Sequence, residues 1–78
     1  MNLEGANLTD ANISNAALEE AVLEGAKLSN AFLIETDLSK AHLNFANLKG
    51  GNLTNAVLNY AHVDGVKLNG AILRGADL

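Results

Sequence analysis

Aliphatic residues recur at every fifth position along the whole chain. Two positions before each of them stands a smaller residue, which is Ala in twelve of sixteen cases. A repeat this regular constrains the fold more than any other property of the sequence. The aliphatic positions, which are expected to form a core ladder, are Leu3, Leu8, Ile13, Leu18, Leu23, Leu28, Leu33, Leu38, Leu43, Leu48, Leu53, Leu58, Val63, Leu68, Leu73 and Leu78.

The five-residue period excludes both an α-helix and a long strand. On a helix, five residues advance a side chain by about 140°, so successive leucines would wind around the cylinder. On a strand, the odd spacing sends alternate leucines to opposite faces. Within one repeat, however, Ala and Leu are two residues apart and share a side. Each repeat is therefore predicted to be a short extended piece followed by a turn, so that the chain coils around an axis.

The position two residues after each Leu supplies the predicted turn. It holds residues that tolerate the dihedral angles of tight turns. They are Gly5, Gly25, Gly50, Gly65, Gly70 and Gly75, together with Asp10, Asn15, Asn30 and Asn55.

The repeat also resembles that of the pentapeptide-repeat family, in segments such as Ala6-Asn7-Leu8-Thr9-Asp10 and Ala46-Asn47-Leu48-Lys49-Gly50. The resemblance covers the whole chain. It implies an all-β fold, a right-handed quadrilateral parallel β-helix with four pentapeptides in each coil. Residues 1–78 would then form a single domain of about four coils, with no separate capping helix. Each core residue would pack on the residue twenty positions away.

Composition limits the classes of function. The chain has no Cys, which excludes disulfides and thiol ligands. Its net charge is −4 and its five basic residues are scattered along the sequence, so we expect no nucleic-acid partner. Residues 1–4 lack the basic start of a signal peptide, and no stretch approaches the roughly 20 apolar residues of a membrane span. We therefore expect no membrane partner and a cytoplasmic location.

One group of residues has the composition of a metal site. A spacing of twenty places His42 and His62 on adjacent coils, and Asp64 follows two residues later. Imidazole and carboxylate groups suit Zn²⁺ or Ni²⁺. The alternative is a pair of solvated histidines on a regular ladder. This alternative is favoured because nothing in the sequence supplies the outer partners that orient metal ligands, so no metal and no cofactor is expected.

A second group consists of apolar residues that are predicted to point outward. Phe32 and Ile34 flank Leu33, and Ile72 falls in line with Phe32 two coils away. A contiguous exposed patch often marks a partner surface, although scattered single hydrophobic residues are normal. Phe45 and Tyr60 occupy turn positions, where we expect a structural role first.

The two end coils are expected to expose apolar side chains and unpaired backbone. Such ends favour an end-to-end homo-oligomer or contact with an adjoining repeat domain.

No arrangement of Ser, His and Asp or of paired carboxylates stands out from the repeat, so no catalytic residue is assigned and an enzyme is not expected. The predicted function is a scaffold whose rigid faces bind a protein partner of unknown identity. The family resemblance implies an alternative, an acidic DNA mimic that inhibits a type II topoisomerase such as gyrase. Nine acidic residues diluted by five basic ones make this alternative the weaker of the two.

Overall fold

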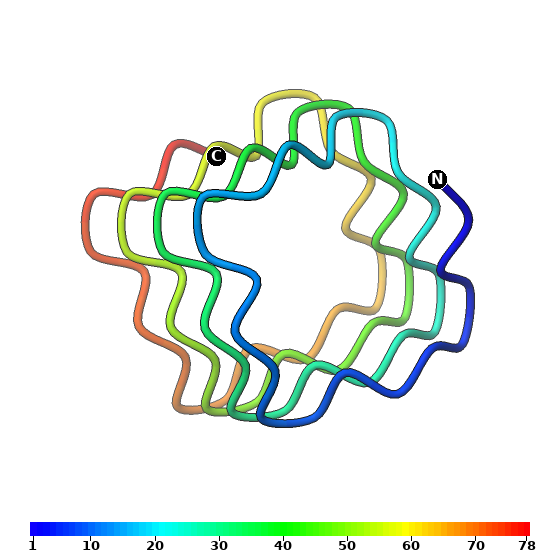
Figure 1. Cartoon of the computed structure of the whole chain (residues 1–78), viewed down its shortest axis with the longest axis horizontal. Helices are drawn as coiled ribbons and strands as arrows, with labels where there is room; N and C mark the ends of the chain where they lie inside the picture. The colour runs from blue at the N-terminus through cyan, green and yellow to red at the C-terminus, as the bar shows by residue number, and fades with distance from the viewer.

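A computed structural model describes all residues from 1 to 78 as one coiled tube without a helix (Figure 1). Twelve parallel bridges join residues that are twenty apart, from Asn2 with Val22 to Val57 with Asp77. Each bridge is a single residue wide, so no longer strand forms. With twenty residues per coil, each coil contains four pentapeptides. The prediction of a parallel β-helix is confirmed. The structure contains no helix long and apolar enough to span a membrane.

Backbone hydrogen bonds tie every coil to its neighbours. We term the residue between the inner small residue and the core Leu the bridge residue. Its N–H donates to a carbonyl of the preceding coil. In the middle of the tube, the His42 N–H donates to the Ala21 carbonyl at 2.9 Å. The next residue, Leu43, donates in the other direction, to the His62 carbonyl at 2.8 Å. Adjacent coils therefore form a continuous ladder without long strands.

The chain turns sharply after each core residue. The carbonyl of Leu43 accepts a hydrogen bond from the N–H of Ala46 at 2.9 Å, which closes a four-residue turn. All fifteen corner residues, nine of them non-glycine and six glycine, have φ between 59° and 70°. A positive φ at the third residue of a turn is typical of type II. The sequence predicts this for Gly, Asn and Asp, but five other residues adopt it as well, namely Glu20, Glu35, Lys40, Phe45 and Tyr60. The ladder on both sides imposes the conformation on them.

A non-glycine residue with positive φ incurs a free-energy cost for its left-handed backbone. Two glycine corners allow this cost to be separated from the cost of steric contact. Gly25 and Gly65 have similar φ values, +67° and +70°. A β-carbon on Gly25 would meet nothing within 4 Å, whereas one on Gly65 would lie 2.6 Å from Cδ1 of Phe45. We expect Gly25→Ala to cost about 1 kcal/mol for the left-handed backbone alone. Gly65→Ala should cost more and displace the Phe45 ring, as measured by chemical denaturation. Equal costs would contradict the placement of that ring.

The four sides of the tube are here called wall 1 to wall 4, in chain order. Wall 1 contains the pentapeptides centred on Leu3, Leu23, Leu43 and Val63, and each later wall starts five residues further along. Nine of the sixteen ladder residues, from Leu18 through Leu58, are buried. In the last coil Val63 is 47% and Leu78 75% exposed, because no further coil covers them. The core thus lies in the middle of the tube and opens at its ends.

Thr36 is the one buried polar side chain of the core. It replaces Ala at an inner position, and its Oγ1 donates a hydrogen bond to the Ile13 carbonyl at 3.0 Å. Because the hydroxyl is satisfied, its burial does not leave an unpaired polar group.

Candidate interaction surfaces

The bridge residues point outward, and many of them are bound to their own backbone. Asn7 is typical: its Oδ1 accepts from the N–H of Thr9 at 3.2 Å and from the Thr9 hydroxyl at 2.8 Å. The same backbone contact is made at five more bridge positions, Asn2, Asn12, Asp37, Asn47 and Asn52. These side chains fix the approach to the corner. Sequence reasoning missed this role, although the preference for Asn or Asp before Leu is its signal.

Ser14 and Asn44 replace this contact where the bridge residue cannot make it. Phe32 has no acceptor for the N–H two residues on, and Ser14 of the preceding coil accepts from Ile34 instead, at 3.1 Å. Asn44 likewise accepts from the N–H of Asp64, at 2.9 Å. The walls therefore hold their backbone rigidly even where outward apolar or imidazole groups interrupt the pattern.

Asp37 is the carboxylate most strongly engaged by this network. The Ser39 hydroxyl donates to its Oδ1 at 2.6 Å and the Ser39 N–H donates at 3.0 Å. The hydroxyl bond first, and the backbone bond second, lower the pKa of Asp37 below its ordinary value of 3.8. Folding therefore favours the ionised form of this group.

The sign of this shift predicts how stability changes with acid. A carboxylate with a lowered pKa in the folded state stabilises the protein above pH 3.8, and the contribution is lost as the pH falls through the lowered folded-state pKa. We expect Asp37→Asn, which keeps an acceptor but does not titrate, to reduce the loss of thermal stability in this acidic range. Ser39→Ala should reduce it as well. The midpoint of thermal unfolding, followed by circular dichroism between pH 7 and pH 2.5, tests this. An unchanged acid dependence in both variants would contradict it.

His42 and His62 lie against each other on wall 1. Their ring centroids are 4.9 Å apart and the ring planes differ by 6°. Parallel stacked rings direct their in-plane lone pairs side by side rather than at one point, which suits solvated rings better than metal ligands. The structure does not bring three or more His, Cys, Asp or Glu side chains together as a metal site, so Asp64 does not complete one.

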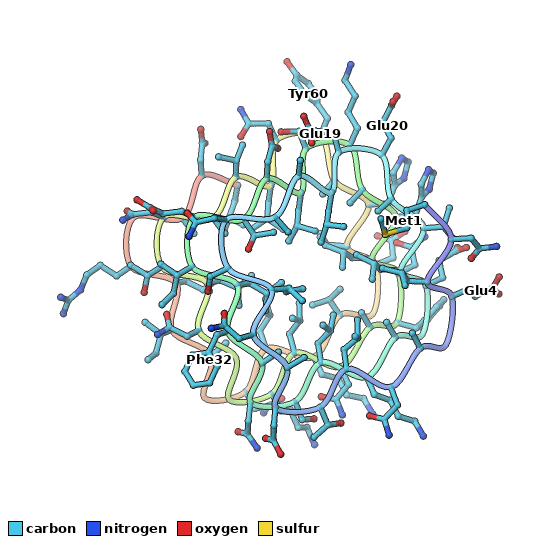
Figure 2. All side chains as sticks on the ribbon, in the orientation of Figure 1. Met1, Glu4, Glu19, Glu20, Phe32 and Tyr60 are labelled. Atoms are coloured by element: carbon cyan, nitrogen blue, oxygen red, sulfur yellow. The ribbon has the colours of Figure 1, made fainter.

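The apolar residues predicted as a partner surface lie on wall 3. Phe32 is 46% and Ile72 49% exposed, while Ile34 is half-buried. Figure 2 shows the Phe32 ring on the outside of the tube. Asn52 lies between Phe32 and Ile72 and bridges to both, so the apolar groups alternate with a polar one along the wall.

The coil gathers charges that are far apart in the sequence. Wall 2 carries Lys27, Lys49 and Lys67, so three of the five basic residues that are scattered along the sequence lie on one side of the tube. Wall 4, on the opposite side, carries four acidic residues and one basic residue, namely Glu19, Glu20, Asp37, Asp77 and Lys40. The negative net charge is therefore unevenly distributed around the tube.

The C-terminal end of the tube is an open apolar cavity. Its volume is about 140 Å³ and only hydrophobic residues line it. They are Leu43, Leu48, Leu53, Leu58, Val63, Val66, Leu68, Leu73 and Leu78. The core ladder is exposed there at Val63, Leu68 and Leu78.

The fold and its surfaces define a repeat solenoid of the parallel β-helix class. The family model for pentapeptide repeats matches residues 1–25, 18–55 and 36–75. The chain belongs to the pentapeptide-repeat family, as its sequence predicted. Proteins of this family are generally non-catalytic structural repeat proteins. No match was found among curated proteins.

Two solved structures from cyanobacteria are similar to this chain. Rfr23, a pentapeptide repeat protein from Cyanothece 51142, is 33% identical with a TM-score of 0.72, over 91% of this chain and 56% of that protein. HetL from Nostoc sp. strain PCC 7120, described as involved in heterocyst differentiation regulation, is 38% identical with a TM-score of 0.66. The match covers 99% of this chain and 38% of HetL. The chain thus spans little more than half of one relative and less than half of the other.

Proposed function

We propose that the chain is a non-enzymatic scaffold that presents rigid walls to a protein partner, with Phe32, Ile34 and Ile72 on wall 3 as a contact surface. The observation that carries this proposal is the exposure of large apolar groups on a hydrogen-bonded backbone, which is tied to both neighbouring coils at Phe32 and to the preceding coil at Ile72. A surface ordered before binding loses little conformational entropy when a partner docks. HetL is described as acting in regulation, which agrees with a role in binding.

Affinity capture from the native host tests the proposal with matched wall variants. We expect Phe32→Ser combined with Ile72→Ser to lose the captured protein, because both changes remove exposed apolar contact area. Lys49→Gln on wall 2 should retain it. Unchanged circular dichroism would show that the folds are intact. Capture that is equal for every wall variant, or no captured protein at all, would contradict the proposal.

The DNA-mimic alternative requires negative charge around the rod. Wall 2 opposes this requirement, because it carries three Lys residues against one carboxylate, Asp10. We therefore expect no inhibition in a DNA-supercoiling assay with gyrase. Inhibition that is weakened by Glu19→Gln and Glu20→Gln would favour the alternative instead.

The open C-terminal cavity supports a second part of the proposal, in which another coil covers this end. That coil would come from a second copy of the chain or from an adjoining repeat domain, and its aliphatic residues would bury Val63, Leu68 and Leu78. For the 78-residue chain we expect an apparent mass that rises with concentration in light scattering. A Leu68→Lys and Leu78→Lys variant should remain monomeric. A monomer at all concentrations would contradict self-association.

Three finer features belong to the same proposal. The right-handed sense of winding is supported by Figure 1, where the chain runs clockwise from the blue coil in front to the red coil behind. About four coils follow from 78 residues at twenty per coil. A crystal structure tests both. A cytoplasmic location is tested by fractionation of host cells.

A further inference from the structure

Wall 1 collects most of the ring-bearing side chains of the protein. The chain has five such residues, and Phe45, His42 and His62 lie on this wall. Tyr60 is the corner residue immediately before the last segment of the wall. Tyr60 is 82% and Phe45 71% exposed. Figure 2 shows Tyr60 projecting away from the tube. Corner residues are exposed throughout the tube, so the corner geometry leaves both rings open to contact.

Gly65 makes room for one of these rings. Carbon atoms of the Phe45 ring would be only 2.6 and 2.8 Å from a β-carbon at position 65, so the ring lies over the glycine of the next coil. The ring thereby reaches the level of the last coil, on which His62 stacks with His42. Along residues 60–65 the wall thus offers Tyr60, then His62, then Asp64, and then the Phe45 ring over Gly65.

Asp64 stands in the sequence between His62 and Gly65, the glycine beneath the Phe45 ring. Asp64 is the second residue of the turn that follows Val63, and both Asp64 and His62 are exposed. The Asp64 backbone is fixed by the bond from its N–H to Asn44. Its carboxylate accepts no hydrogen bond within the protein, in contrast to Asp37, which takes two from Ser39.

The charge of wall 1 is negative. Its three carboxylates are Glu4, Glu24 and Asp64, and none of its four pentapeptides contains Lys or Arg, although Lys40 occupies the corner before His42 as Tyr60 does before His62. A cation that approaches this wall meets carboxylates and ring faces, both of which attract positive charge.

The geometry points to an arginine side chain of a protein partner as the group that wall 1 binds. A guanidinium is planar, so it can stack on the Phe45 ring while donating two parallel hydrogen bonds to Asp64. A Lys ammonium can satisfy the charge but cannot stack as a plane. The inference rests on the proposed binding role. It adds that the partner contacts wall 1, in addition to wall 3, and that it does so through an arginine side chain.

Titration with a short peptide, followed by ¹H–¹⁵N NMR spectra, tests the inference. The probe is acetyl-Gly-Arg-Gly-Arg-Gly-amide, and the same peptide with citrulline or Lys in place of Arg serves for comparison. We expect shift changes confined to residues 42–45 and 60–65. Asp64→Asn and Phe45→Leu should each weaken binding by about two- to fivefold. The matched variant Asp77→Asn, on wall 4, should bind like the original chain.

Several results would overturn the inference. Two concern the peptide: shift changes on another wall, or no shift change up to about 10 mM peptide. The others are a citrulline peptide that binds as tightly as the arginine peptide, and an unchanged affinity in both Asp64→Asn and Phe45→Leu. If the peptide fails while the wall 3 variant still loses its captured protein, only the arginine inference is wrong. If no partner is captured in the first place, the binding role itself fails.

Discussion

Leu28→Ala is expected to lower the free energy of unfolding by about 2 to 5 kcal/mol. Leu28 is fully buried and lies in the wall 2 stack between Leu8 and Leu48. The neighbouring coils are fixed by the ladder, so they can close only part of the space that the lost side chain leaves. Since a domain of this size has a total stability of roughly 4 to 12 kcal/mol, the variant should melt far below the original chain. Urea denaturation followed by far-ultraviolet circular dichroism gives the difference.

Leu68→Ala is the matched control for this prediction. Leu68 occupies the same stack in the last coil, where it is already 37% exposed. Its truncation removes less buried area and leaves no closed cavity, so the cost should be clearly smaller. Equal costs for the two variants would show that Leu28 is not an inner rung.

Asn47→Pro is expected to destabilise the middle of the ladder. The N–H of Asn47 donates to the Ala26 carbonyl at 2.9 Å. Proline removes this donor and leaves a buried carbonyl unpaired, which costs about 1 to 3 kcal/mol before any steric strain of the ring. Thermal and urea unfolding should both show the loss.

Asn7→Pro is the control for the loss of the ladder bond. Asn7 occupies the same position on wall 2 in the first coil, where its N–H has no coil to donate to. Both residues use Oδ1 to accept from the N–H two positions on, and Asn7 also accepts from the Thr9 hydroxyl, so Asn7→Pro loses at least as many side-chain contacts as Asn47→Pro. The cost of Asn47→Pro should therefore exceed that of Asn7→Pro. A larger or equal cost for Asn7→Pro would contradict the ladder.

The surfaces were less predictable than the core. The spacing of His42 and His62 by twenty residues predicts that they are neighbours, but it does not give the parallel stacking of their rings, which depends on side-chain dihedral angles. The exposure of Phe32 could be predicted from the repeat. The placement of the Phe45 ring over Gly65 could not, since it depends on free space one coil away. Asn44 accepting from Asp64 likewise joins residues whose contact requires the coil register.

The sequence by itself determined the inward and outward positions, because a period of five allows only a coil whose aliphatic residues share the interior. It also determined family membership, through the repeat itself. Tertiary structure alone decided which outward side chains remain available to bind a partner. Hydrogen bonds between and within coils engage Asp37 and Asn7 while leaving the Asp64 carboxylate free. Coil stacking likewise gathers three lysines on one wall and carboxylates on the opposite one, because residues twenty apart in sequence are nearest neighbours in space.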